Sequence, residues 1–269
     1  SGGAGVKLTA YILVKNEEAN LANCLGALHQ AGVPTIILDS GSTDRSREIA
    51  EQRGCEVERY RYRDHLEAFR YICAVRTRRD HLALVLDADM VVSRELLSEA
   101  QALLVHGNVD VAVAPVRMYW NGLPMCRGSL CPPKPFLFRG GAHYFGPLGH
   151  GEGLIPGTKV VVTRHALVHN DLKPFEAYLA SQVRYAQNLL CRRALGKLSW
   201  RDRLRTTPFM MLVSPAVSYL LRGGIFAGKT GLGYALDRLI AEAIMYRQHI
   251  AAENVPVAKS LAIRVSDPN

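Results

Sequence analysis

Short apolar runs alternate with helix-like patterns in the first half of the chain. Runs closed by polar residues predict buried strands at Leu8–Val14, Thr35–Leu38, Cys55–Tyr60, Leu82–Leu86 and Val111–Val116. Between them, helical spacing predicts a helix that Thr43 or Asp44 caps and that runs to about Arg53, and another at Leu66–Arg78. Strands alternating with helices are typical of an α/β fold with a mostly parallel sheet and flanking helices.

The pattern changes after residue 120. Residues 121–157 are rich in glycine and proline, and an irregular stretch of this length usually carries a binding site or a lid. From Pro174 onward the periodicity predicts helices at Phe175–Leu195, Leu212–Leu221 and Gly233–Ala252. The longest nearly apolar stretch, Phe209–Leu221, is too short to cross a bilayer unaided, so a soluble protein is expected.

Charge and cysteine content narrow the classes of partner. Lysine and arginine (33) outnumber aspartate and glutamate (24) by 9, which suits phosphorylated sugars, nucleic acid or an anionic membrane surface. Many cations follow residue 180 and are interleaved with apolar residues, so a membrane-surface role and a solvated helical face both stay open. Nucleic acid is disfavoured because no nucleic-acid-binding motif accompanies the charge. Six cysteines without a C-x-x-C pair favour thiols in a reducing compartment, although Cys126 and Cys131 are close enough in sequence to pair if oxidised.

Polar clusters follow three of the predicted strands, at the carboxyl edge where open α/β sheets bind ligands. They are Val14-Lys15-Asn16-Glu17-Glu18, Asp39-Ser40-Gly41-Ser42-Thr43-Asp44 and Asp87-Ala88-Asp89. Carboxylates at the first two could accept hydrogen bonds from a base and a ribose, and Gly41 lets the backbone approach a ligand closely, so a nucleoside fits. Asp39 and Asp44 are also ordinary turn and cap residues. Capping is favoured for Asp44, and both interpretations stay open for Asp39.

Asp87-Ala88-Asp89 gives the sharpest chemical prediction. Two carboxylates separated by one residue of extended chain point the same way, so both can address one hard cation and its diphosphate. Such a cation neutralises the charge that develops on a leaving nucleoside diphosphate. The motif alone is a weak signal, but its position directly after Leu82–Leu86 raises it above chance.

These motifs resemble those of family 2 glycosyltransferases of the inverting GT-A type, which share the V-K-N-E opening, the D-S-G-S-T-D turn and the L-D-A-D strand end. The chain is also similar to bacterial lipopolysaccharide inner-core β-glycosyltransferases. That similarity rests on Gly149-His150-Gly151-Glu152, Leu167-Val168-His169, Arg184-Tyr185-Ala186 and Leu221–Gly228. Together the segments span about Leu8 to Ile250.

The resemblance implies a Rossmann-like GT-A fold, the fold of nucleotide-diphospho-sugar transferases. Residues 1–7 would be a disordered lead or tag remnant, and residues 8–172 the catalytic domain. Within that domain the nucleotide-sugar half would cover about 8–116 and the acceptor half about 117–172. Residues 173–269 would form a helical segment packed on the same domain.

The resemblance also assigns a donor site. A UDP-sugar would be held at its uracil and ribose by Asp39 and Glu17, with Asp87 on the nucleoside. The other residues expected to bind the donor at these strand ends are Val14, Asn16, Gly41 and Ala88.

Metal binding would fall to Asp89 and to His169, which reaches the cation, Mn²⁺ or Mg²⁺, from a separate strand end. From the residues alone, His169 is better explained as a helix-entry or satisfied core histidine, with Asn170 or Asp171 as the cap. The family resemblance favours the ligand role instead.

Glu152 is the candidate catalytic base, because an inverting transfer needs one carboxylate to remove the proton of the acceptor hydroxyl. Relatives place the histidine and glutamate side by side, whereas Gly151 separates His150 from Glu152 here. This departure predicts either a displaced glutamate or a loop rebuilt around another acceptor. An exposed loop glutamate without a role is the alternative.

The chain departs from these relatives at two further places. Relatives carry an arginine before a leucine-aromatic pair, whereas this chain leaves Lys134 and Arg139 as the nearby cations that could hold the diphosphate. Arg70 falls near a basic position of relatives and could touch phosphate or base, although a surface salt bridge fits equally well. Ala227 stands where many relatives have leucine-aspartate, so that position lends little functional support.

The sequence thus predicts an inverting, metal-dependent hexosyl- or heptosyl-transferase on the cytoplasmic side of a bacterial inner membrane. Its acceptor would be a lipid-linked or lipopolysaccharide glycan, approached by the basic helical segment lying on the headgroups. One alternative is a transferase acting on a soluble natural product or a polyprenyl phosphate. A non-catalytic nucleotide-binding scaffold is the alternative from another class. A nucleotidyltransferase is disfavoured because residues 15–18 are not a glycine-rich basic loop.

Overall fold

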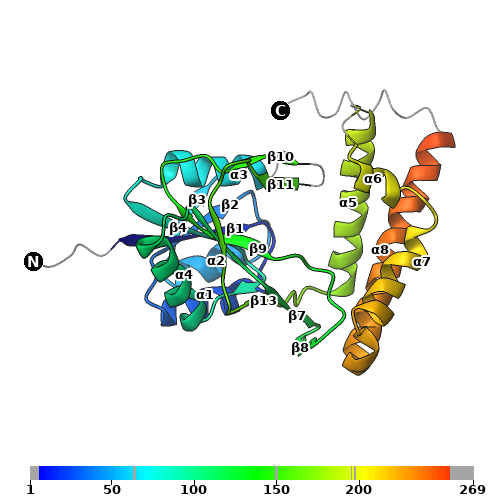
Figure 1. The fold of residues 1–269 in the computed structure, drawn as a ribbon, viewed down its shortest axis with the longest axis horizontal. Coiled ribbons are helices and arrows are strands. Elements are labelled where there is room, and N and C mark those ends of the chain that lie inside the picture. The colour runs from blue at the N-terminus through cyan, green and yellow to red at the C-terminus, as the bar shows by residue number, and fades with distance from the viewer. Residues whose placement is uncertain (1–5, 63–64, 149–150, 195, 197, 255–269) are drawn as a thin grey trace, which may run out of the picture. The chain divides into compact units, whose positions relative to one another are not determined.

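The computed structural model describes residues 6–62, 65–148, 151–194, 196 and 198–254. The chain divides into two compact units (Figure 1). Unit 1 holds Ser1–Pro124 and Cys131–Leu172, and unit 2 holds Met125–Leu130 and Lys173–Asn269. The predicted packing of the helical segment on the catalytic domain stays a prediction.

Unit 1 is built on a seven-stranded sheet with the strand order β12-β6-β9-β4-β1-β2-β3 (Figure 1). Its strands are β1 (Lys7–Val14), β2 (Thr35–Asp39), β3 (Glu56–Arg59), β4 (His81–Asp87), β6 (Val111–Ala114), β9 (Lys134–Arg139) and β12 (Val160–Val162). All neighbours pair in parallel except β9, which runs antiparallel to both β4 and β6. The predicted α/β fold with a mostly parallel sheet is confirmed.

The central strands are apolar on both faces because helices cover both sides of the sheet. In β1, Ala10, Ile12 and Val14 join one buried cluster, while Tyr11 and Leu13 join the other. The first cluster is closed by α1 (Leu21–Gln30), α2 (Ser46–Gln52) and α4 (Arg94–His106). The second is closed by α3 (His65–Arg70), the π-helical turn η1 (Tyr71–Arg76) and Phe145 of the hairpin β10–β11.

Two predicted elements differ in the structure. The single helix expected at Leu66–Arg78 is α3 continued by η1 and ends at Arg76. The strand expected at Val111–Val116 divides at Pro115 into β6 and β7 (Val116–Trp120), because proline has no N–H to donate to a sheet ladder.

The stretch expected to be irregular, residues 121–157, contains four strands. They are β8 (Leu123–Pro124), β9, β10 (Phe145–Leu148) and β11 (Gly151–Leu154). The reason for β9 is its Phe136-Leu137-Phe138 run, which is fully buried in the middle of the main sheet. The irregular interpretation was therefore wrong for this part.

A second, small sheet connects distant parts of unit 1. It has the order β5-β13-β7-β8, with β5 (Met90–Val91) antiparallel to β13 (Leu167–His169). His169 lies opposite Met90, the residue that follows Asp89. This pairing brings the end of β13 to the end of β4.

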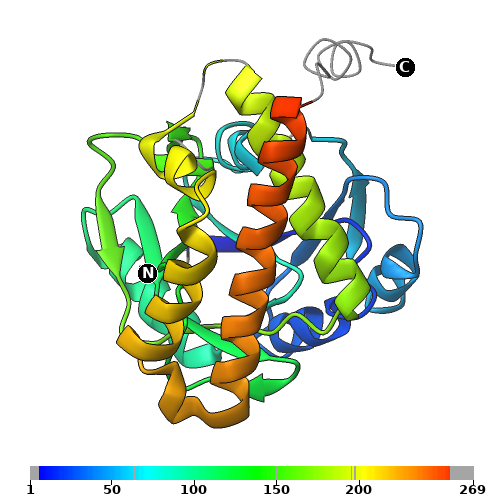
Figure 2. The ribbon, with the colours of Figure 1, turned by 90° about the vertical axis from the view of Figure 1, so that its right-hand side faces the viewer.

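Unit 2 is helical (Figure 2). Its elements are α5 (Phe175–Ala194), α6 (Trp200–Arg205), α7 (Met210–Ala216), η2 (Val217–Leu221), η3 (Gly224–Ala227) and α8 (Gly228–Asn254). The three predicted helices correspond to α5, to α7 with η2, and to α8, which begins earlier than expected; α6 was not predicted. Among the described residues, no single helix is both long enough and apolar enough to cross a membrane.

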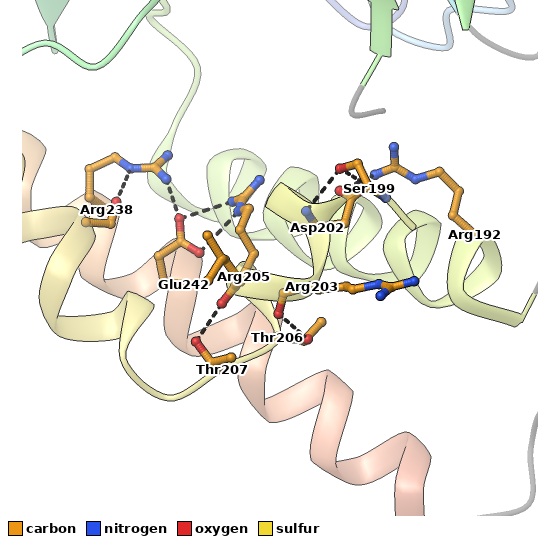
Figure 3. Close-up of polar contacts among 11 residues, drawn as sticks. Arg192, Ser199, Asp202, Arg203, Arg205, Thr206, Thr207, Arg238 and Glu242 are labelled. Atoms are coloured by element: carbon orange, nitrogen blue, oxygen red, sulfur yellow. Dashed lines mark hydrogen bonds and ion pairs between the residues drawn. The ribbon is translucent and has the colours of Figure 1, made fainter. Parts of the chain in front are cut away.

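Buried charges join the helices of unit 2 (Figure 3). The Glu242 carboxylate, only 1% exposed, accepts hydrogen bonds at 3.2 Å from Nε and Nη2 of Arg205 and one more from Arg238. Arg238 Nε also donates to Ser214 Oγ at 3.2 Å. Ser199 and Asp202 form a capping box at the start of α6. One carboxylate thus links α6, α7 and α8.

We expect Glu242→Ala to destabilise the helical unit by about 3 kcal/mol, because it leaves two partly buried guanidinium groups without their carboxylate. Urea unfolding followed by circular dichroism measures the loss. Glu176→Ala, at an exposed position of α5, is the matched control and should change stability little. Equal effects of the two substitutions would contradict the assigned role of Glu242.

Candidate active site

The strand register aligns the polar strand ends at one edge of the main sheet. Val14 lies opposite Asp39, and Leu13 lies opposite Asp87. Because β9 is antiparallel, its first residue, Lys134, lies at this same carboxyl edge. The sheet therefore gathers the ends of β1, β2 and β4 with a cation from β9.

Asp87 and Lys134 form an ion pair, with their side chains 29% and 21% exposed. Burial alone would lower the pKa of Lys134, but the adjacent Asp87 carboxylate outweighs it and raises the pKa above the ordinary lysine value. The predicted proximity of Lys134 to the metal-motif aspartates is thus present. Ala88, between the two aspartates, is buried at 1% exposure.

Asp89 contacts His169, whereas Asp87 contacts Lys134. Asp89 Oδ2 lies 3.3 Å from His169 Nε2, and the two side chains are 16% and 24% exposed. Burial lowers the pKa of His169, but the hydrogen bond and charge of Asp89 raise it above its ordinary value. Asp89 Oδ1 and His169 Nδ1 are buried without a hydrogen-bond partner, as is Asn170 Oδ1 beside them. Buried polar atoms are normally satisfied by protein, water or a bound ion, so these three atoms mark a place where a ligand can bind.

The residues fit a divalent cation only in part. Among the described residues, no three His, Cys, Asp or Glu side chains converge as a complete metal site. Asp89 and His169 offer a carboxylate oxygen and an imidazole nitrogen, which suit Mn²⁺ or Mg²⁺ when diphosphate oxygens and water complete the shell. In this geometry Asp87 is engaged by Lys134, so the two aspartates do not address one point together.

The loops after β1 and β2 are joined by hydrogen bonds. The Asn16 N–H donates to Ser42 Oγ at 3.0 Å, and the Thr43 N–H donates to Asn16 Oδ1 at 2.8 Å. The Glu17 N–H donates to Ser46 Oγ at 2.8 Å. Asn16 adopts φ 56°, a left-handed conformation that asparagine tolerates. These bonds fix the loop that carries Asn16 and Glu17.

Asp39 is buried at 1% exposure and shapes the turn after β2. Its Oδ1 accepts from the Ser42 N–H at 2.9 Å, and its Oδ2 lies 3.7 Å from Arg47 Nε. Gly41 has φ 98°, which side-chain-bearing residues rarely adopt, and open space where a Cβ would lie. The turn interpretation of Asp39 is observed, and its nucleoside contact stays a prediction.

Asp44 stabilises the turn that leads into α2, whose N-cap is Arg45, without a side-chain cap hydrogen bond. Its Oδ1 accepts from the Ser46 N–H at 3.0 Å and its Oδ2 from the Glu18 N–H at 3.0 Å. Burial would raise the pKa of Asp44, but these hydrogen bonds lower it overall.

Asn20 was missed in the sequence, although it is central to the site. Its amide Nδ2 donates to Glu17 Oε2 at 2.9 Å and to Asp171 Oδ1 at 2.8 Å, and its Oδ1 accepts from the Leu172 N–H at 2.8 Å. The side chain is 2% exposed. It ties the loop after β1 to the segment that follows His169.

We expect Asn20→Ala to lower the free energy of unfolding by about 2 kcal/mol, because it leaves several buried groups unpaired. Thermal and urea unfolding measure the change. Asn23→Ala, on the exposed side of the same helix, should cost far less. If both variants unfold alike, Asn20 does not anchor the two segments.

Tyr62 is a second residue missed in the sequence. Its side chain is hydrogen-bonded with Ser40, and the charges of Asp87, Glu17 and Asp39 reach it. Burial first, and then these charges, raise the pKa of Tyr62 to about 12. The Tyr62 ring stacks with Tyr60 at a centroid distance of 6.3 Å. The sequence could have indicated this residue, because Arg61 and Tyr62 come directly after the strand predicted at Cys55–Tyr60, as the other polar clusters come after theirs.

Four predicted residues lie differently from expectation or only partly within the described chain. Arg139 pairs with Leu82 at the opposite edge of the sheet and donates to the carbonyls of Gly107 and Val109, just after α4, so its predicted diphosphate contact is wrong. The Val14 side chain is buried, and its carbonyl accepts from the Ser40 N–H. Arg70 is exposed at the end of α3. Glu152 lies in β11 opposite Pro147, but its side chain and His150 lie outside the described residues.

Comparisons with known proteins match part of the chain. The sequence model of the family described as glycosyl transferase family 2 matches residues 9–134, slightly less than half of the chain. A protein of Rickettsia felis described as an uncharacterized glycosyltransferase is 30% identical over 106 residues, which cover 39% of this chain and 36% of that protein.

Solved structures also resemble part of the chain. Glucosyl-3-phosphoglycerate synthase from Mycobacterium tuberculosis, in complex with Mn²⁺, UDP and glucosyl-3-phosphoglycerate, is 22% identical with a TM-score of 0.36. That match covers 42% of this chain and 45% of the synthase. A mycobacterial protein is 21% identical with a TM-score of 0.37, over 44% of each chain. The chain therefore spans less than half the length of these relatives.

The matched region contains β1, β2 and β4 with their polar ends, and it stops at Lys134. Outside it lie His169 and Glu152, for which the family match gives no support. Residues 9–134 are thus similar to glycosyl transferase family 2.

Proposed function

We propose that this protein is an inverting, metal-dependent glycosyltransferase that moves a hexose from a UDP-sugar to a glycan or glycolipid. The observation that carries the proposal is the pair of buried, unpartnered atoms Asp89 Oδ1 and His169 Nδ1 at the carboxyl edge of the sheet. They lie beside the Asp87–Lys134 ion pair, in unit 1, which also contains the residues that match the model of glycosyl transferase family 2.

Asp89 and His169 would hold Mn²⁺ or Mg²⁺, which supplies charge neutralisation of the leaving diphosphate. Lys134 adds a protonated amine that Asp87 keeps at this edge. A positive charge fixed in a partly buried site stabilises developing negative charge without reorganising at the moment of reaction.

The nucleoside would lie against the ends of β1 and β2. Asp39 and Glu17 are its proposed polar partners, with Asn16 and Gly41 shaping the loop around it. We add Tyr62 to this group because its half-buried ring lies within electrostatic reach of Asp39 and Glu17. The hydrogen bonds that join the two loops hold these groups in place before a ligand arrives.

Glu152 is the proposed base that removes the acceptor proton. It lies on β11, next to the inserted Gly151 that distinguishes this chain from the relatives it resembles. We expect Glu152→Gln to abolish transfer while leaving donor binding unchanged, because the amide cannot accept the proton. Activity assays and calorimetric titration with UDP separate the two effects. Unchanged transfer would remove Glu152 from the mechanism.

The proposed acceptor is a lipid-linked or lipopolysaccharide glycan at the cytoplasmic face of a bacterial membrane. The excess of 9 positive charges and the basic helical unit support contact with an anionic surface. A soluble natural product or a polyprenyl phosphate is the alternative acceptor.

A panel of UDP-, GDP- and ADP-sugars, each with and without Mn²⁺, tests the proposal by thermal unfolding. A donor at about 100 times its Kd stabilises the folded state by roughly 2.7 kcal/mol, so the matching donor should raise Tm clearly. Metal-dependent hydrolysis of that donor separates an enzyme from an inactive scaffold. Stabilisation by none of the donors would overturn the proposed function.

A further inference from the structure

Large apolar side chains gather on the outside of unit 2 between α6 and α8. We call residues 209–232, which include α7, η2, η3 and the first turn of α8, the elbow. Its most exposed members are Leu221 (80%), Phe226 (75%), Phe209 (73%) and Leu212 (72%). The other large apolar side chains that it exposes are Val213, Leu220, Ile225 and Leu232. This is an unusual concentration, because exposed apolar residues of soluble proteins are normally scattered.

The polarity of α7 and η2 is the reverse of that of a soluble amphipathic helix. Phe209, Leu212 and Val213 recur at helical spacing and are exposed, whereas Ser214 and Ser218 are buried on the other side. Ser214 accepts from Arg238 of α8, so its burial is satisfied. The helix therefore turns its polar side chains toward the protein and its apolar ones outward.

The inside of the elbow is packed by small residues. Ser218 Oγ donates to the Gly128 carbonyl at 2.7 Å, and the Gly128 N–H donates to the Arg222 carbonyl at 3.0 Å. A Cβ at Gly231 would collide with the Gly224 carbonyl. Close backbone packing through small residues, with polar groups bonded internally, is how helices associate where lipid surrounds them.

The charge of the elbow indicates what kind of partner this surface binds. No aspartate or glutamate occurs between Asp202 and Asp237. Arg222 and Lys229 are exposed, and the Arg127 guanidinium lies 5.9 Å from the centre of the Phe226 ring. An apolar surface bordered by cations alone complements an anionic bilayer, with side chains in the hydrocarbon and cations among the phosphates.

The geometry favours entering the bilayer and returning over crossing it. Met210–Leu221 and Gly224–Ala252 meet the length and hydropathy requirements of a span only when taken together, and they are bent by 66° at the break. The two most exposed side chains, Leu221 and Phe226, flank that break. The tip of the elbow is therefore also its most apolar exposed part.

We propose that the elbow is a membrane anchor that inserts residues 220–226 into one leaflet of an anionic bilayer. This goes beyond surface contact by the basic helices, because it assigns the anchoring to the apolar side chains of the tip. Neither nucleotide nor metal takes part in the proposed membrane binding. The anchor can therefore be tested independently of the proposed sugar transfer.

Co-sedimentation of the full chain with vesicles tests the anchor. We expect the protein to bind phosphatidylcholine vesicles that contain phosphatidylglycerol, and to bind pure phosphatidylcholine more weakly. Leu221→Glu with Phe226→Glu should lower the bound fraction about tenfold or more, because two charges replace apolar groups at the tip. Both positions are exposed, so the fold should persist by circular dichroism. Val75→Glu, at an equally exposed apolar position of unit 1 (73%), should bind as the parent does.

A second readout separates insertion from adsorption. In Phe226→Trp, we expect fluorescence to shift to the blue on vesicle binding and to be quenched by lipids brominated on their acyl chains. Binding that salt abolishes and the double glutamate variant retains would show adsorption through basic residues alone and overturn the proposal. A concentration-dependent dimer that the double variant abolishes, without vesicle binding, would assign the surface to a second copy and also overturn it.

Discussion

Replacing Asp89 with alanine is expected to lower the rate of sugar transfer by about 10³-fold and to remove the metal-dependent part of nucleotide binding. The reason is that Asp89 supplies the carboxylate whose buried Oδ1 has no protein partner. Steady-state kinetics and titration of UDP with and without Mn²⁺ measure the two losses. Both should fall together, since one cation is proposed to serve both.

Controls separate this role from stability. Asp89→Asn keeps the shape of the side chain, so it should fold normally and still lose most of the activity. Asp80→Ala removes an exposed aspartate just before β4, at the far edge of the sheet, and should leave kinetics unchanged. If Asp89→Ala binds UDP and metal as the parent does, the metal assignment fails.

The strand ends could be predicted from the sequence because apolar runs stop abruptly there. Leu86 is followed by Asp87 and Val14 by Lys15, and β4 and β1 end at Asp87 and Val14. In parallel strands this boundary alone places the polar residues at one edge. Asp44 could be assigned to the start of α2 for a similar reason, since one of its partners, Ser46, is close in sequence, although Arg45 and not Asp44 is the N-cap.

The direction of β9 could not be predicted from the sequence. This direction determines at which edge of the sheet Lys134 and Arg139 lie. The proline-rich segment before it indicated a loop, and a strand of either direction could have buried Phe136 and Phe138. Because β9 is antiparallel, Lys134 reaches the ligand edge and Arg139 the opposite one. Sequence proximity made the two residues look equivalent.

Asn20 illustrates a second limit. At the start of a helix it has the pattern of an ordinary cap, yet the structure shows no side-chain cap hydrogen bond there. Its partner Asp171 lies 151 positions away and arrives through the pairing of β13 with β5. Contacts of this kind depend on tertiary packing, for which local patterns carry no signal.

Lys134→Met should lower kcat/KM about 100-fold, because it removes a positive charge held in a partly buried site where the diphosphate is proposed to lie. Methionine preserves most of the side-chain volume, so packing changes little. Lys134→Arg should recover part of the activity. Lys159→Met, at an exposed position of the same unit, is the matched control.

The ion pair between Asp87 and Lys134 has to be considered when the kinetics of Lys134→Met are interpreted. In Lys134→Met, Asp87 also loses its counter-charge, so Asp87→Asn and the double variant are needed to complete a cycle. If Lys134 acts on the diphosphate, Lys134→Met should still reduce the rate when Asp87 is already asparagine. If it acts only by balancing Asp87, the double variant should match Asp87→Asn alone.

Because the pKa of Lys134 is raised, its charge is retained up to and beyond the ordinary lysine pKa of about 10.4. We therefore expect that titration of Lys134 does not change the rate near neutral pH. The pH profile of the rate in that range should be the same for the parent and for Lys134→Arg.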